Sequence, residues 1–148
     1  RGGFWDLLPS VRGTPLFCAA LSGQLDAARV LVDAKADVHI PSTGGKTLAT
    51  VAARKGHDGV LSLLIESKAS VDRPNAKGES PVFIAATYGQ SAPLRTLIEA
   101  KADIDKLHND RLTPTEAAEL GGHDDCARLL REANNGHERI TLDSELCP

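Results

Sequence analysis

Residues 13–38 read GTPLFCAALSGQLDAARVLVDAKADV. The stretch opens with a Thr-Pro pair, continues as a short apolar run that ends at Gly23, and then carries a second run with apolar residues at helical spacing. Threonine is a preferred N-cap residue, proline is favoured at the first helical position, and glycine commonly ends a helix. The stretch therefore predicts two short helices joined by a tight turn, each with one buried face.

The same pattern recurs three more times at a fixed offset of 33 residues. The offset superposes the cap residues Thr14, Thr47, Ser80 and Thr113, and likewise the glycines Gly23, Gly56, Gly89 and Gly122. Helices this short are not stable alone in water, so each pair has to bury its apolar face on neighbouring pairs. Self-similarity at a fixed period is typical of a repeat solenoid.

The composition fits a single all-α domain. The chain has 148 residues, of which 41% are hydrophobic, and this is enough for a real core. Only three Phe, one Trp and one Tyr are present, so Ala, Leu and Val dominate the apolar content, which favours thin helical layers over a β-sandwich. A formal net charge of −3 argues against wholesale binding to nucleic acid or to an anionic membrane.

Several features bear on the compartment. No apolar stretch approaches the roughly 18 residues of a membrane span, and residues 1–10 lack the basic lead and apolar run of a signal peptide. Cys18, Cys126 and Cys147 form neither a CxxC pair nor a disulfide framework. We therefore expect an intracellular, reducing compartment and a soluble or peripheral protein. The absence of Met suggests a processed chain or part of a longer one, so the alternative is an imported plastid or mitochondrial protein.

The stretch 13–38 resembles the ankyrin repeat, whose copies read G-x-T-P-L-H-x-A-A-x-x-G-H and end L-L-L-x-x-G-A-D-V-N. The resemblance covers residues 12–133 and implies an all-α solenoid of stacked helix-turn-helix pairs with β-hairpin-like loops, in four repeats at 12–44, 45–77, 78–110 and 111–133. The copies are degenerate. The His of T-P-L-H is replaced by Phe17, Thr50, Phe83 and Glu116, and the Gly before A-D-V is replaced by Lys35, Lys68, Lys101 and Asn134.

The two ends depart from the repeat pattern. We interpret residues 1–11 as an N-terminal cap segment in which Phe4, Trp5, Leu7 and Leu8 cover the first repeat, with a partner-binding anchor as the alternative. Residues 134–148 form an acidic C-terminal tail, for which disorder and an extended pairing segment are the two interpretations.

Three motifs suggest chemistry that the repeat explains more simply. STGGKT at 42–47 is similar to a phosphate-binding loop, but the first glycine of that motif would have to be at Ile40. GGHDD at 121–125 places a His beside two carboxylates, yet its Gly-His is the interhelix turn, and His57 and His123 belong to repeats two layers apart. Cys18 and Cys126 are expected to be small buried residues, and Cys147 to be exposed. We expect no catalytic activity, cofactor or metal.

By resemblance, partners bind ankyrin arrays on the concave surface made by the hairpin tips and the exposed side of the first helices. The equivalent positions here include Lys46, Arg54, Lys55, Lys77, Glu79, Tyr88, Asn109 and Leu112. Repeat 45–77 has six basic and three acidic residues, whereas the third and fourth repeats sum to −2 each. The basic residues among these positions predict either a solvated face or a docking site for an acidic or phosphorylated segment of a partner protein.

Two roles follow. The first is a non-catalytic module for protein–protein interaction, and the alternative is a permanent subunit of a larger hetero-oligomeric assembly, such as one associated with an organelle membrane (for example a plastid photosystem). A regulatory fragment of a larger enzyme or channel is a third.

Lys35, Lys68 and Lys101 raise a separate question, because they could form a binding stripe. By resemblance, each follows a second helix in the left-handed conformation, where a side chain costs on the order of 1 kcal/mol. A cation at a helix C-terminus recovers about 0.3–1 kcal/mol from the helix dipole. We therefore favour an architectural role for these lysines.

Overall fold

A computed structural model describes residues 13–109 and 111–145, the stretch 137–145 as backbone only. This part of the chain contains eight α-helices and no strand. The helices are α1 (Pro15–Ser22), α2 (Leu25–Asp33), α3 (Leu48–Lys55), α4 (Asp58–Glu66), α5 (Pro81–Thr87), α6 (Ser91–Glu99), α7 (Pro114–Leu120) and α8 (Asp124–Glu145). The expected N-terminal cap segment, with Phe4, Trp5, Leu7 and Leu8, lies outside the described residues.

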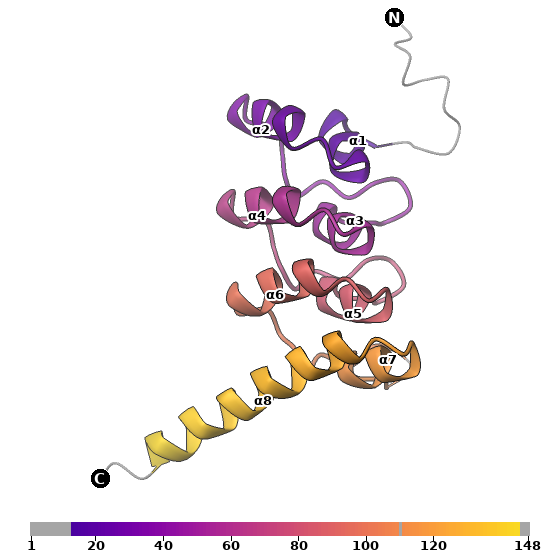
Figure 1. Cartoon of the computed structure of the whole chain (residues 1–148). Helices are drawn as coiled ribbons and strands as arrows, with labels where there is room; N and C mark the ends of the chain where they lie inside the picture. The colour runs from indigo at the N-terminus through magenta and orange to yellow at the C-terminus, as the bar shows by residue number, and fades with distance from the viewer. Residues whose placement is uncertain (1–12, 110, 146–148) are drawn as a thin grey trace, which may run out of the picture.

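The helices form four antiparallel pairs that stack in one direction (Figure 1). The first helices α1, α3, α5 and α7 form one column, and the second helices α2, α4, α6 and α8 form a second column beside it. Each helix contacts the equivalent helix of the next pair, as in α3 against α5 and α4 against α6. This arrangement confirms the predicted all-α solenoid.

The ends of the first helices are fixed by local hydrogen bonds. The hydroxyl of Thr14 accepts the backbone N–H of Phe17 at 3.2 Å, and the same N-cap bond recurs at the other three repeats. The four glycines at the interhelix turns have φ of 69°, 77°, 69° and 72° in chain order. A left-handed residue satisfies the last carbonyls of a helix, and glycine adopts it without steric cost. The predicted caps are therefore confirmed.

The core combines small residues in the first column with leucines in the second. Ala20, Ala53 and Ala86 are fully buried, which lets neighbouring first helices approach closely. Leucines dominate the buried face of the second helices, and Leu61, Leu94, Leu97 and Leu130 are all 0% exposed. Cys126 belongs to this core as predicted, whereas Cys18 is only half-buried, so the prediction for Cys18 was wrong. Cys18 lies in the pair α1–α2, which among the described residues has a neighbouring pair on one side alone, α3–α4.

The loops between pairs are hairpin-like without forming strands. Backbone bonds span these turns, among them those from Ser42 N–H to the Lys46 carbonyl at 2.9 Å and from Asn75 N–H to the Glu79 carbonyl at 3.0 Å. Adjacent loops are tied by a bond from Ala76 N–H to the Gly45 carbonyl at 3.1 Å. The loops lie beside the first helices, so both together form one face of the stack (Figure 1).

The three recurring lysines adopt the conformation that the family resemblance implies. Lys35, Lys68 and Lys101 have φ of 65°, 64° and 60°. Each follows a second helix, and the N–H of the next residue bonds back to a carbonyl of that helix, as Ala102 does to Leu97 at 3.0 Å. They therefore mark where α2, α4 and α6 end. Asn134, the equivalent residue of the fourth repeat, lies inside α8 and does not end it.

Helix α8 continues past Ala133 to Glu145, where the sequence predicts an unstructured or extended tail. The stretch contains no proline before Pro148 and one glycine, Gly136, which costs only about 1 kcal/mol in a helix interior. Residues 134–145 are thus helical.

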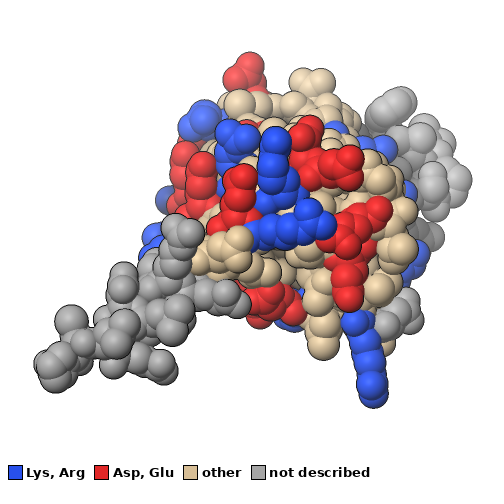
Figure 2. All heavy atoms as spheres, turned by 60° about the horizontal axis from the view of Figure 1, so that its bottom comes forward, with Lys and Arg blue, Asp and Glu red and all other residues tan. Residues whose placement is uncertain are grey.

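The α7–α8 end of the stack is charged (Figure 2). Glu119 stands where the earlier repeats have a buried alanine, and it forms an ion pair with Arg131 in which both side chains are solvent-exposed. A polar outer face is typical of a terminal repeat in a solenoid, because it meets water rather than another repeat. None of the described helices is long and apolar enough to cross a membrane.

Candidate functional site

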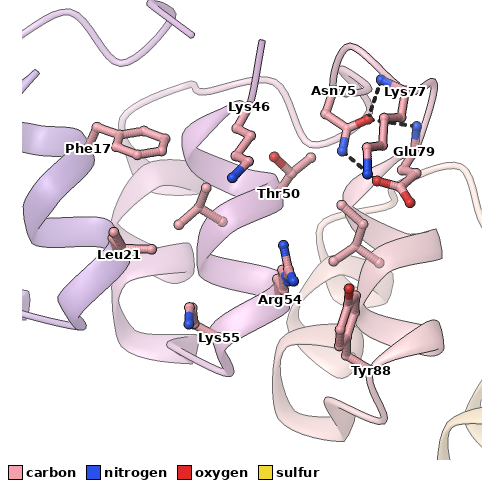
Figure 3. A pocket seen from close by; sticks show the side chains of 12 residues that line it. Phe17, Leu21, Lys46, Thr50, Arg54, Lys55, Asn75, Lys77, Glu79 and Tyr88 are labelled. Atoms are coloured by element: carbon pink, nitrogen blue, oxygen red, sulfur yellow. Dashed lines mark hydrogen bonds between the residues drawn. The ribbon is translucent and has the colours of Figure 1, made fainter. Parts of the chain in front are cut away.

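A pocket of about 290 Å³ lies on the face formed by the first helices and the loops. It is bounded by α1, α3 and α5 and by the loop that precedes α5 (Figure 3). We call it the α3–α5 pocket. Its lining residues are Phe17, Leu21, Lys46, Thr50, Val51, Arg54, Lys55, Asn75, Lys77, Glu79, Ile84 and Tyr88.

Helix α3 positions three of the four basic side chains. Lys46 directly precedes the N-cap Thr47, and Arg54 and Lys55 form the last turn of the helix. Lys46 and Lys55 are nine residues apart, which at 1.5 Å per residue separates their backbones by roughly 13 Å. Lys77 comes from the next loop. The basic groups therefore surround the pocket rather than meet at one point (Figure 3).

The guanidinium of Arg54 lies over the ring of Tyr88, with Cζ 4.8 Å from the ring centroid. Tyr88 is the C-cap residue of α5, so this cation–π contact joins two successive repeats. The backbone carbonyl of Arg54 also accepts a bond from Gln90 Nε2 at 3.2 Å. Arg54 is thus held at both its backbone and its side chain by the repeat that follows.

Asn75 organises the loop edge of the pocket. Its Oδ1 accepts the backbone N–H groups of Lys77 at 2.9 Å and Glu79 at 3.1 Å, and its Nδ2 donates to Glu79 Oε2 at 2.7 Å. Asparagine commonly builds such turns because its short amide can bond to nearby backbone. The bonds fix the Glu79 carboxylate at the rim while the Lys77 side chain is left for solvent or a ligand.

The rim combines four cations with one carboxylate, and the floor is apolar. Among the described residues, none of the four basic side chains takes part in an ion pair. The floor includes the buried side chains of Phe17, Val51 and Ile84. A site of this kind attracts an anionic group and an apolar group together.

The structure brings together six of the eight residues predicted from the sequence. Lys46, Arg54, Lys55, Lys77, Glu79 and Tyr88 all line the pocket, whereas Asn109 and Leu112 do not. Asn109 instead donates from Nδ2 to the Lys77 carbonyl at 2.8 Å and thereby joins two loops. Leu112 is half-buried and accepts a backbone bond from His108 at 2.9 Å, which closes its own loop.

Sequence reasoning missed Asn75 and the apolar floor. The offset of 33 residues places Asn75 with Ser42 and His108 at the first residue of each hairpin turn, and an Asn three residues before a Gly, here Gly78, is a recognisable turn signal. No signal in the sequence could have identified the floor residues, because Phe17, Val51 and Ile84 look like ordinary core residues of their helices.

The motifs that suggested other chemistry have structural roles. In STGGKT, the carbonyl of Ser42 accepts a bond from Gly45 N–H at 2.8 Å, and Thr47 caps α3. His57 and His123 each bond through Nε2 to a backbone carbonyl of the preceding repeat, at 3.2 and 3.0 Å. The His57 ring also lies where a side chain at Gly23 would be, 2.6 Å from the position of a Cβ atom. No group of metal-binding side chains occurs among the residues the structure describes.

The chain matches a known protein family. The family model described as ankyrin repeats (3 copies) matches residues 6–75 and again residues 50–141, which together span most of the chain. No curated protein matches the chain.

Proposed function

Because the chain belongs to the ankyrin repeat family, we propose that it is a non-catalytic module that binds a partner protein at the α3–α5 pocket. Ankyrin repeats generally mediate protein–protein interaction. The observation that carries the proposal is the ring of four basic side chains around an apolar floor, none of them paired with a described acidic residue.

The charge of the pocket favours an acidic segment of the partner. Charge-assisted hydrogen bonds from Arg and Lys to carboxylates are shorter and stronger than neutral ones. The rest of the array has excess negative charge, since the third and fourth repeats sum to −2 each, so the basic pocket contrasts with its surroundings. Electrostatic attraction should speed association at low salt, and the association rate should fall as ionic strength rises.

The experiment is affinity purification with mass spectrometry, using the chain as bait. The test bait carries Lys46→Glu, Arg54→Glu, Lys55→Glu and Lys77→Glu. A matched control reverses four exposed basic residues away from the pocket, Arg29, Arg73, Arg95 and Arg128. Circular dichroism on both baits checks that the helices still form.

We expect partners recovered by the wild-type and control baits to be lost with the pocket variant. Equal recovery by the pocket variant would place the partner elsewhere on the molecule and refute the assigned site. Loss with both variants would show that only the overall charge matters, which also contradicts a specific pocket.

A second candidate role is that of a permanent subunit in a larger assembly, and α8 is the observation that favours it. The helix runs for 22 residues and extends well past the other helices of the stack (Figure 1). A helical extension that leaves its own domain commonly gains its stability by packing on another surface. Size-exclusion chromatography of a native extract distinguishes the roles, because a species eluting at the size of the monomer contradicts permanent assembly.

A further inference from the structure

We infer that the α3–α5 pocket recognises a short extended peptide in which a bulky apolar residue precedes or follows a Glu or Asp by two or three positions, with Arg54 as the carboxylate-binding residue and Tyr88 as the residue that positions it. The inference rests on the proposed function and specifies its ligand. It follows from the division of the pocket into an apolar part and an arginine that is already oriented.

Arg54 is prepared to bind a carboxylate through its edge. Its guanidinium lies over the face of the Tyr88 ring, with Cζ 4.8 Å from the centroid, and the aromatic ring restricts its position without accepting a conventional hydrogen bond from its N–H groups. No described residue accepts a hydrogen bond from this side chain, although its backbone carbonyl is bound by Gln90. A planar fork of donors held in place matches the two oxygens of a carboxylate and loses little conformational entropy on binding.

Part of the apolar lining lies one repeat away from this arginine. Phe17 and Leu21 belong to α1, whereas the Arg54–Tyr88 contact joins α3 to α5. Val51 on α3 and Ile84 on α5 extend the apolar floor to the two helices of that contact. Figure 3 shows Phe17 and Leu21 on one side of Arg54 and Tyr88 on the other. Packed helices are about 8–10 Å apart, and an extended chain advances about 3.3 Å per residue. An apolar anchor and an acidic residue therefore fit the two parts when they are two or three residues apart.

The arrangement favours carboxylates over a phosphate group. Lys46 and Lys55 lie at opposite ends of α3, roughly 13 Å apart by helix rise, so their charges are spread along the helix rather than concentrated at one point. The Glu79 carboxylate is fixed at the rim by Asn75 and repels a dianion more than a monoanion. Basic groups spread along the pocket instead suit several single charges along a peptide.

The test begins with a displayed library of random 12-residue peptides panned on the full chain. Enriched peptides are synthesised with a fluorescent label, and their dissociation constants are measured by anisotropy. We expect enrichment of one bulky apolar residue two or three positions from Asp or Glu. Replacing the acid with its amide, or the apolar residue with Gly, should each weaken binding about tenfold or more. Enriched peptides that lack either feature would overturn the inference.

Variants of the chain test whether binding depends on the fixed geometry of the Arg54 side chain or only on its charge. Arg54→Lys keeps the charge but loses the planar fork, and we expect about tenfold weaker binding. Tyr88→Ala should weaken binding several-fold, whereas Tyr88→Phe, which keeps the ring, should restore it to within about twofold. Once Tyr88 is Ala, the added change Arg54→Lys should cost much less than it does alone. Additive effects, or no rescue by Phe, would contradict a positioning role for Tyr88.

The outcomes distinguish this inference from the proposed function. If the fourfold charge reversal abolishes peptide binding but Arg54→Lys and Tyr88→Ala do not affect it, the pocket remains the binding site and the inference fails. If the charge reversal has no effect, both fail. Tighter binding of a peptide with phosphoserine at the acidic position would overturn the choice of carboxylate.

Discussion

Replacing Lys35, Lys68 and Lys101 together with glycine should leave the stability of the array unchanged or raise it. The three lysines have φ of 65°, 64° and 60°, a region that costs a side-chain-bearing residue about 1 kcal/mol relative to glycine. Each lysine also lies at a helix C-terminus, where its charge contributes about 0.3–1 kcal/mol. The net change is about 0 to 0.7 kcal/mol of stabilisation at each site, or roughly 0 to 2 kcal/mol for all three.

The matched control replaces the same three lysines with alanine. Alanine keeps the strained φ and loses the charge, so we expect the free energy of unfolding to fall by about 1–3 kcal/mol for the three sites together. The informative quantity is the difference of about 3 kcal/mol between the glycine and alanine variants, since the charge is absent from both. Urea unfolding at low ionic strength, followed by circular dichroism, measures it.

A glycine variant no more stable than the alanine variant would refute the reasoning, because it would mean that the left-handed backbone carries no strain. The same variants address binding. The peptides enriched on the wild-type chain should bind the glycine variant with unchanged affinity, and a loss would indicate that the lysines form a binding stripe after all.

Three further predictions concern the core, a thiol and a helix cap. Leu97→Ala should lower the free energy of unfolding by about 2–5 kcal/mol in urea titrations, because the side chain is 0% exposed between stacked helices. Burial, together with the charge of Asp125, raises the pKa of the Cys126 thiol, so iodoacetamide at neutral pH should modify it only after unfolding, as peptide mass spectrometry can follow. Bonds from the backbone and then the side chain of Thr113 lower the pKa of Glu116 in the folded state. The ionised Glu116 carboxylate therefore stabilises the fold above the pKa that this carboxyl has in the unfolded chain, near 4.5. This stabilisation is lost as pH falls through the lower pKa of the folded state. Thermal melts between pH 6 and 3 should thus show a smaller acid loss for Glu116→Gln than for the wild type.

Much of the fold was predictable because it depends on local interactions. An N-cap hydroxyl bonds to an N–H three residues on, and a left-handed residue closes the helix that precedes it, so Thr14 and Gly23 determine the limits of α1 within ten residues of chain. The fixed offset of 33 residues then transfers the same limits to the other pairs. Helix α8 escaped this reasoning, because Asn134 holds the position at which lysines end the earlier second helices and yet lies inside α8 without a left-handed backbone.

In the candidate site, too, some features follow from the local sequence pattern and others depend on contacts between repeats. The sequence, through its resemblance to the ankyrin repeat, predicted that Lys46, Arg54 and Tyr88 lie on one face, since each holds a hairpin or first-helix surface position of that family. Only the tertiary structure decided that Arg54 stacks on Tyr88, that Asn75 fixes Glu79, and that Asn109 joins two loops instead of lining the pocket. The physical reason is that contacts between repeats depend on the spacing and rotation of successive layers. These are set by how buried side chains of neighbouring helices interlock, and no local pattern along the chain records them.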